Sequence, residues 1–247
     1  MKTRLLLLHG FTGAPASYDG VRALLDERFD VICPALSGHA GQTFAGVTRF
    51  EDELERLHLL LGDARGLVLC GYSLGARLAL GLLAKAPQRF AHATLIGVHP
   101  GLSDAAERAE RLAADARWAA VLRDQGLAAF LERWSAQPLF SSQGRLPAQA
   151  LQAQRALREA QDAEGLALAL ERFSLGNMPC YWPGLSALKT PITLAAGELD
   201  AKFVDIAQRA LRELPNAKLL IAPGAGHNLL LERPDLVVRS LSTEELP

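Results

Sequence analysis

Cysteine is scarce in this chain, and its few copies are arranged neither as pairs nor as metal ligands. Only 3 occur among 247 residues. They are Cys33, Cys70 and Cys180. An odd and widely spaced set argues against a disulfide framework and against a zinc site. Cys33 and Cys70 lie in apolar segments, where cysteine behaves as a small hydrophobic residue, so we expect both to be buried.

Long apolar runs are missing as well. No segment approaches the roughly 18 continuous apolar residues that a membrane-spanning helix needs. The N-terminal stretch MKTRLLLLHG has a basic start, but its four leucines are too few for the apolar part of a secretory signal. We therefore expect a cytoplasmic protein with no membrane partner.

Neither sign of charge dominates, since 26 Lys and Arg face 27 Asp and Glu and the net charge is −1. This balance gives no indication of a nucleic-acid partner, although a local group of cations can still bind a small anion. A chain of this length fits one large α/β domain or two small ones. Its composition is compatible with a monomer or a small homo-oligomer.

What the chain does contain is a series of short apolar runs, each followed by glycine or proline and then by a helical pattern. The runs read as strands at 4–9, 29–34, 66–71, 92–97, 191–197 and 217–223. Helices are expected near 14–26, 48–61, 74–86, 203–213 and 234–242. Runs that are apolar on both faces are typical of parallel strands covered by helices. The alternation predicts a mostly parallel, doubly wound α/β sheet.

One interval breaks this alternation. Residues 101–183 contain no convincing strand and are rich in Ala, Leu, Arg and Glu, which favour helix. We therefore expect an α/β core formed by residues 1–100 and 184–247, with residues 101–183 inserted as a helical cap.

Ser73 lies in the motif Gly-Tyr-Ser-Leu-Gly, between a predicted strand and a predicted helix. A serine on such a sharp turn has its Oγ exposed above the sheet, and the flanking Gly71 and Gly75 let backbone pass closely. This context predicts a nucleophile elbow. The alternative is a glycine-rich turn in which Ser73 only caps the following helix.

Two further residues complete a catalytic triad. Asp200 and His227 each follow the end of a predicted strand, where open α/β sheets place their sites. The chain order Ser73, Asp200, His227 is that of the α/β-hydrolase fold. His227 alone would read as a surface histidine, and the joint placement favours the triad. The amides of Phe11 and Leu74 are the expected oxyanion hole, which suits an enolate or a tetrahedral intermediate equally.

The whole chain resembles α/β-hydrolase proteins and, more narrowly, the 2-succinyl-6-hydroxy-2,4-cyclohexadiene-1-carboxylate (SHCHC) synthase family of menaquinone biosynthesis. The matching segments are LHGFTG, GYSLGARLAL, HPGLSDAAERAERLAADARWA, FLERWSAQPLF, LERFSLGNMPCYWPGL, GELDAKF and GAGHNLLLERP. They extend from residue 8 to residue 234 and include the predicted insertion.

The resemblance implies a lyase that needs no metal or organic cofactor. Its substrate would be a tricarboxylate, 2-succinyl-5-enolpyruvyl-6-hydroxy-3-cyclohexene-1-carboxylate, from which pyruvate is eliminated. Ser73 would remove a proton beside a carbonyl, His227 would activate Ser73, and Asp200 would orient His227.

A set of residues is expected to bind this substrate. It comprises Tyr72, Arg77, Arg108, Arg111, Trp134 and Lys202. Arg77 follows Ser73 by four positions and so lies on the same side of the helix, where a guanidinium can grip a carboxylate. For the others the alternatives stay open: Arg108 and Arg111 can form an exposed ion-paired face, Lys202 can be a surface lysine, and Tyr72 can serve packing alone.

The chain departs from the family pattern in places. It starts almost at the first parallel strand, so the antiparallel strands that usually precede it are expected to be absent. Ser37 replaces a usual glycine, and Ala76 stands where a second glycine is common. A carboxylesterase or thioesterase with the same triad is the main alternative function. A non-catalytic binding protein of the same fold is disfavoured by the complete triad.

Overall fold

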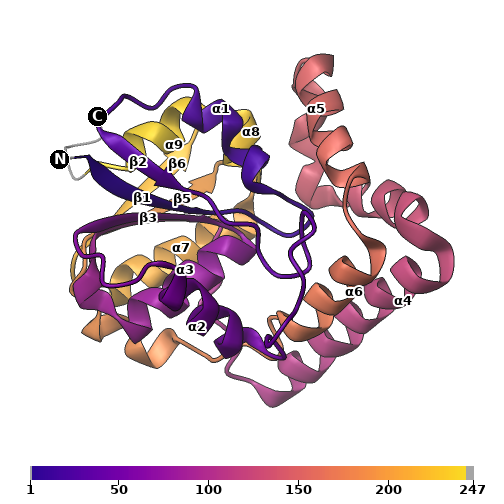
Figure 1. Cartoon of the computed structure of the whole chain (residues 1–247), viewed down its shortest axis with the longest axis horizontal. Helices are drawn as coiled ribbons and strands as arrows, with labels where there is room; N and C mark the ends of the chain where they lie inside the picture. The colour runs from indigo at the N-terminus through magenta and orange to yellow at the C-terminus, as the bar shows by residue number, and fades with distance from the viewer. Residues whose placement is uncertain (1, 243–247) are drawn as a thin grey trace.

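The computed structural model describes residues 2–242, which form a six-stranded parallel sheet with helices on both faces (Figure 1). The strands are β1 (Thr3–Leu8), β2 (Phe29–Ile32), β3 (Leu67–Tyr72), β4 (Phe90–Ile96), β5 (Ile192–Gly197) and β6 (Ala217–Ala222). Their order is β2-β1-β3-β4-β5-β6, and every neighbouring pair is parallel. The six strands predicted from the apolar runs are confirmed.

The leucine run of β1 explains why both faces of the sheet are covered. Side chains alternate between the faces of a strand. Leu6 and Leu8 pack in the apolar layer on one face, and Leu5 and Leu7 pack in the layer on the other. All four are fully buried, so the uninterrupted run stabilises the two layers equally.

Two groups of helices provide these layers. They are α2 (Phe50–Leu60), α3 (Leu74–Lys85) and α7 (Ala201–Glu213) on one face, and α1 (Asp19–Arg22), α8 (Leu229–Glu232) and α9 (Pro234–Ser240) on the other (Figure 1). The helix expected over 14–26 is instead a 3-10 turn at Pro15–Tyr18 followed by the single turn of α1. Tyr18 and Val21, both fully buried, pack these two short turns against the sheet.

The strand order reverses at β1, which has β2 on one side and β3 on the other. In open α/β sheets the carboxyl ends of the strands at such a reversal border a crevice that holds the site. The segment after β1 contains Phe11, and the residue after β3 is Ser73. The topology therefore brings these two segments together.

Between β4 and β5 the described residues form helices and no strand. The helices are α4 (Ala105–Ser135), α5 (Ala148–Glu159) and α6 (Ala163–Arg172), with 3-10 segments at Pro138–Arg145 and Trp182–Ala187. α4 is broken at Gly126, and α4 and α6 share an apolar cluster of their own. Figure 1 shows these helices beside the carboxyl end of the sheet. None of the helices in residues 2–242 is long and apolar enough to cross a membrane.

Candidate active site

Ser73 lies on a tight turn between the end of β3 and the start of α3. Its φ of 52° is in the left-handed region, which costs a non-glycine residue about 1 kcal/mol or more. The two glycines of the motif make this turn possible. A Cβ on Gly71 would collide with the carbonyl of Gly75, and one on Gly75 would collide with the carbonyl of Leu8.

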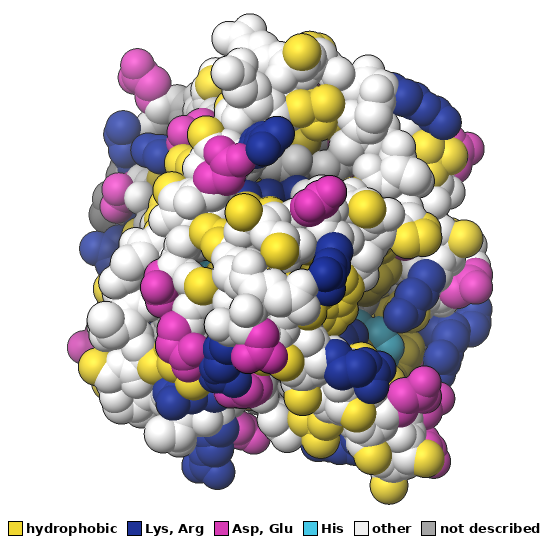
Figure 2. Space-filling model, turned by 90° about the vertical axis from the view of Figure 1, so that its right-hand side faces the viewer, with side chains coloured by type: hydrophobic (Ala, Val, Ile, Leu, Met, Phe, Trp, Pro, Cys, Tyr) yellow, Lys and Arg dark blue, Asp and Glu magenta, His cyan; other side chains and the backbone are white. Residues whose placement is uncertain are grey.

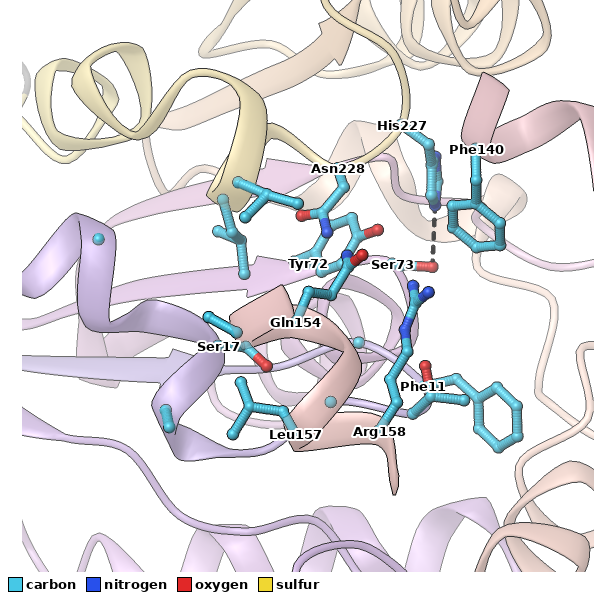
Figure 3. A pocket seen from close by; sticks show the side chains of 18 of the residues that line it. Phe11, Ser17, Tyr72, Ser73, Phe140, Gln154, Leu157, Arg158, His227 and Asn228 are labelled. Atoms are coloured by element: carbon cyan, nitrogen blue, oxygen red, sulfur yellow. Dashed lines mark hydrogen bonds between the residues drawn. The ribbon is translucent and has the colours of Figure 1, made fainter. Parts of the chain in front are cut away.

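Ser73, His227 and Asp200 form a continuous hydrogen-bonded chain. The Oγ of Ser73 lies 3.1 Å from Nε2 of His227 (Figure 3), and Nδ1 of His227 lies 2.6 Å from Oδ2 of Asp200. Because Nδ1–H donates to the carboxylate, Nε2 is left to accept the hydroxyl proton of Ser73. His227 and Asp200 are both buried, so little water competes for these bonds.

Packing fixes the orientation of the His227 ring as well. The ring of Phe203 lies 4.6 Å and that of Tyr72 lies 5.4 Å from it, centroid to centroid. Gly97, with a φ of +58°, leaves the space for the ring, because a Cβ there would be 2.7 Å from Cε1 of His227. The imidazole is therefore held in place before any ligand binds.

The amides of Phe11 and Leu74 come from neighbouring strand ends, after β1 and β3. Neither N–H group has an acceptor within residues 2–242. Both residues line a cavity that also contains Ser73, and the N-terminus of α3 adds a favourable dipole there. Two unpaired N–H groups in this position can stabilise an oxyanion.

His9 supports the turn that contains Phe11. Its Nδ1–H donates to the carbonyl of Gly10 at 2.9 Å, and its Nε2 accepts the N–H of Leu36 at 3.1 Å. Gly13 N–H donates back to the carbonyl of Gly10 and closes the turn. Burial lowers the pKa of His9 to about 4, so the ring is neutral and its donor and acceptor roles are fixed.

Because its core contains buried neutral histidines, we expect the folded protein to lose stability in mild acid. Burial lowers the pKa of His9 to about 4 and that of His39 to about 3. The unfolded chain therefore binds more protons below pH 6.5, and each histidine removes about 1.4 kcal/mol of stability per pH unit as the pH falls from 6.5 toward 4. We expect urea unfolding of His39→Asn to depend less on pH between 7 and 5. Equal pH slopes for variant and wild type would contradict this assignment.

Two cavities meet at Ser73. One has a volume of about 480 Å³ and the other about 450 Å³. The residues that border both are Phe11, Ser73, Trp134, Leu139 and His227. We call the smaller one the arginine compartment, since it is lined by Arg77 and Arg111, and the larger one the α5 compartment, since helix α5 forms its outer wall. A ligand at Ser73 can therefore extend in two directions.

Arg77 lines the arginine compartment. It donates to the carbonyl of Phe173 at 2.8 Å and lies 3.9 Å from the Sδ of Met178, and no carboxylate is paired with it in the described part of the chain. Burial and the neighbouring Arg111 lower the pKa of Arg77 to about 9. Its charge is thus held at an energetic cost, which a bound carboxylate would offset.

Two other predicted cations line the same compartment. Arg111 forms a 2.8 Å ion pair with Asp115, whose carboxylate also accepts the hydroxyl of Ser174. Lys202 approaches from the start of α7, beside the ring of Phe203. Figure 2 shows a hollow on this side of the molecule, with a histidine inside it and Lys and Arg side chains around its rim.

The remaining predicted residues are placed differently. Arg108 lines neither cavity and instead donates to the carbonyls of Leu102 and Met178. Trp134 separates the two compartments, stacked 5.3 Å from Phe130 with its Nε1 buried and without an acceptor among residues 2–242. Tyr72 lines the α5 compartment, so its side chain reaches the site as well as packing against His227.

Arg158 and His99 are among the site residues that were not predicted. Arg158 on α5 lines the α5 compartment, and Figure 3 shows its guanidinium directed toward Ser73. Its partners are the hydroxyl of Ser135 and the ring of Phe140, and burial lowers its pKa. His99 lines the arginine compartment, where burial and then Lys202 and other cations lower its pKa to about 4.

The sequence around Arg158 gives no signal that distinguishes it from the other arginines of the insertion. His99 belongs to the HPGL segment, whose position after a predicted strand could have indicated it. Among residues 2–242, no group of three or more His, Cys, Asp or Glu is arranged to hold a metal ion.

The chain is similar to known proteins over nearly its whole length. Residues 5–240 match the alpha/beta hydrolase family. A relative from Bacillus subtilis (strain 168), described as a putative 2-succinyl-6-hydroxy-2,4-cyclohexadiene-1-carboxylate synthase, is 33% identical over 96% of this chain and 88% of its own. A synthase of the same name from Salmonella agona (strain SL483) is 36% identical over 96% of this chain and 92% of its own.

Solved structures are similar to this chain in fold. MenH from S. aureus superimposes with a TM-score of 0.91 at 31% identity, over 96% of this chain and 91% of that one. A thermophilic esterase from Thermogutta terrifontis gives a TM-score of 0.82 at 24% identity, over 98% and 88% of the two chains, which is a likeness of fold alone.

Proposed function

The chain belongs to the alpha/beta hydrolase family, and from this premise we propose that it acts as an SHCHC synthase of menaquinone biosynthesis. Its reaction is the elimination of pyruvate from 2-succinyl-5-enolpyruvyl-6-hydroxy-3-cyclohexene-1-carboxylate. Relatives with that activity in their names match nearly the whole chain. One observation in the site carries the proposal: Ser73 lies between compartments that hold Arg77 and Arg111 on one side and Arg158 on the other.

The charges of the site suit the charges of this substrate. The substrate has three carboxylates, and the two compartments offer the cations Arg77, Arg111, Lys202 and Arg158. Arg77 and Arg158 have no carboxylate partner within the described residues. Unpaired buried guanidinium groups favour a ligand that supplies the missing anions. A neutral ester would leave these charges uncompensated.

The triad supplies the base for the elimination. His227 accepts the Ser73 hydroxyl proton, and Ser73 Oγ removes the ring proton beside the succinyl ketone. The electrons move first onto the ketone oxygen, which the amides of Phe11 and Leu74 stabilise. They then return through the ring double bond and break the carbon–oxygen bond to the enolpyruvyl group. The released enol becomes pyruvate, and the proton returns from His227 to the leaving group or to solvent.

We propose that residues 101–183 act as a cap over this site. The segment supplies Arg111, Trp134, Phe140 and Arg158 to the cavity walls, all from outside the sheet core. A triply charged substrate must enter past these side chains and is then shielded from water by them. The proposed reaction needs no metal or organic cofactor, because the protein and the substrate supply the base, the proton and the leaving group. A cytoplasmic location and a monomer or small homo-oligomer remain predictions.

A neutral ester separates this proposal from a carboxylesterase or thioesterase that uses the same triad. We expect p-nitrophenyl acetate to be at best a poor substrate, because its uncharged groups gain nothing from Arg77, Arg111 or Arg158. Pyruvate release, coupled to lactate dehydrogenase, should give a much higher kcat/KM. Ser73→Ala is the blank for both assays. Efficient ester hydrolysis without pyruvate release would establish the esterase in place of the lyase.

A further inference from the structure

Gln161 joins the inserted helices to two loops of the core. It lies between α5 and α6 and is 7% exposed. Its Oε1 accepts the N–H of Ala40 at 2.9 Å, and its Nε2 donates to the carbonyl of Gly13 at 3.2 Å. The same Nε2 donates to the carbonyl of Leu157 at 3.1 Å, at the C-terminal end of α5. One amide therefore binds three separate segments of the chain.

The two core loops that it binds are strained. Within residues 2–242, the non-glycine residues with positive φ are Thr12 (62°), Ala40 (48°) and Ser73 (52°). Ala40 is itself bonded to Gln161, and Thr12 precedes the bonded Gly13. Conformations of this kind persist only where surrounding contacts hold them. Gln161 supplies such a contact to both loops.

The loop at Gly13 is the turn that presents the Phe11 amide. His9 holds the Gly10 carbonyl of this turn from inside the core, and Gly13 N–H closes the turn onto the same carbonyl. Gln161 holds the Gly13 carbonyl from outside. The position of the Phe11 N–H therefore depends on a residue of the insertion as well as on the core.

The position of helix α5 depends on the same hydrogen bonds of Gln161. Arg158 is its one buried residue, and cavities border both of its faces, since Gln154 and Arg158 line the α5 compartment and also a cavity against α4. Figure 1 shows α5 standing out from the sheet, and Figure 3 shows Leu157 and Arg158 beside the site. With so little packing along its length, α5 is placed mainly by its ends, and Gln161 fixes the end next to Ser73.

We propose that Gln161 is a positioning residue that couples the placement of α5 over Ser73 to the formation of the oxyanion turn. The coupling rests on the proposed function for the use of that turn in catalysis. When α5 is in place, the Gln161 amide donates to the carbonyl of Gly13, and the Phe11 N–H is fixed in the position that binds the oxyanion. When α5 moves away, the turn loses this support. The placement of α5 over Ser73 and the positioning of the Phe11 N–H for the developing charge then occur together.

Gln161→Ala and Gln161→Glu test this coupling. Glutamate keeps an acceptor for Ala40 N–H but has no N–H to donate to the Gly13 carbonyl. Both variants should therefore lose the hydrogen bond that supports the turn. We expect each to lower kcat by about tenfold or more for pyruvate release and for residual p-nitrophenyl acetate hydrolysis alike, because both reactions use the oxyanion hole. The KM for the small ester should change little.

Amide exchange gives a readout independent of turnover. Gly13 N–H donates to Gly10 and not to Gln161, so its exchange rate reports on the turn itself. We expect it to rise in both variants. Asp162→Ala is the matched control, since Asp162 is the neighbouring residue and accepts only the N–H of Gly165 at the start of α6. It should lower the melting temperature but leave kcat and Gly13 exchange as in the wild type.

Three results with the Gln161 variants would overturn the coupling. They are a wild-type kcat in Gln161→Ala, an unchanged Gly13 exchange rate, or a Gln161→Glu variant that behaves like the wild type. Equal losses in Asp162→Ala would also overturn it, because general loosening of the cap would then suffice. If the tricarboxylate is not turned over but ester hydrolysis still falls with Gln161, the proposed function fails and the coupling stands.

Discussion

Ser73→Ala is expected to lower pyruvate release by about four orders of magnitude or more, because the variant has no group to remove the ring proton. Ser73 and His227 both border the meeting point of the two compartments, and alanine leaves His227 without a hydroxyl to activate. The measurement is the initial rate of pyruvate formation, corrected for the rate without enzyme.

The other two triad residues should behave as parts of the same unit. Asp200→Asn reverses the hydrogen bond at Nδ1 and favours the tautomer of His227 that cannot accept the serine proton, so a loss of about four orders of magnitude is expected. His227→Ala should be similar. Melting temperatures serve as the folding control. A folded variant that releases pyruvate at nearly the wild-type rate would remove that residue from the mechanism.

Arg77→Ala is expected to lose about 2–5 kcal/mol of transition-state stabilisation for the tricarboxylate, because it leaves a substrate carboxylate unpaired in a buried compartment. In kcat/KM this is a loss of about 30-fold to several thousand-fold. Arg77→Lys should recover only part of the loss, since an ammonium retains the charge but lacks the planar fork. Residual hydrolysis of a small neutral ester should hardly change, because the triad is intact.

Arg108→Ala is the matched control for this effect. Arg77 and Arg108 both donate to a backbone carbonyl and both contact Met178, but Arg77 lines the arginine compartment and Arg108 does not. If Arg77 binds substrate, Arg108→Ala should lower kcat/KM far less. Equal losses in the two variants, or equal losses of Arg77→Ala on charged and neutral substrates, would assign Arg77 to structural support of the turn at Ser73.

The sheet and the spatial grouping of Ser73, Asp200 and His227 were predictable because each depends on local chain features. A strand such as β1 is covered on both faces, so its leucine run is uninterrupted and easily found. Ser73 is marked by glycines that close backbone contacts require, and Asp200 and His227 each follow a strand end. The helix at 14–26 was wrong in extent, because the helical pattern marks neither the change from 3-10 to α geometry after Tyr18 nor the end of α1 at Arg22.

The side chains that the insertion contributes to the cavities were less predictable, because their partners are distant in sequence. Arg108 and Arg111 are one turn apart on α4, but Arg108 donates to the carbonyl of Met178, far along the chain, as well as to that of Leu102. Arg111 faces the cavity beside Asp115. Arg158 and the exposed Arg155 occupy the same helix, and only the position of α5 against the core distinguishes them. Which arginines of the insertion reach a cavity is therefore determined by tertiary packing.

The most direct test is to incubate the purified chain with the enolpyruvyl tricarboxylate and quantify both products of one reaction. Pyruvate is measured with lactate dehydrogenase, and the cyclohexadiene product is measured by the absorbance of its conjugated double bonds. If Ser73 acts as the base of an elimination, the two products appear in equal amounts, and neither appears above background with Ser73→Ala. Failure of the wild-type chain to form pyruvate, while it hydrolyses neutral esters through Ser73, would contradict the account.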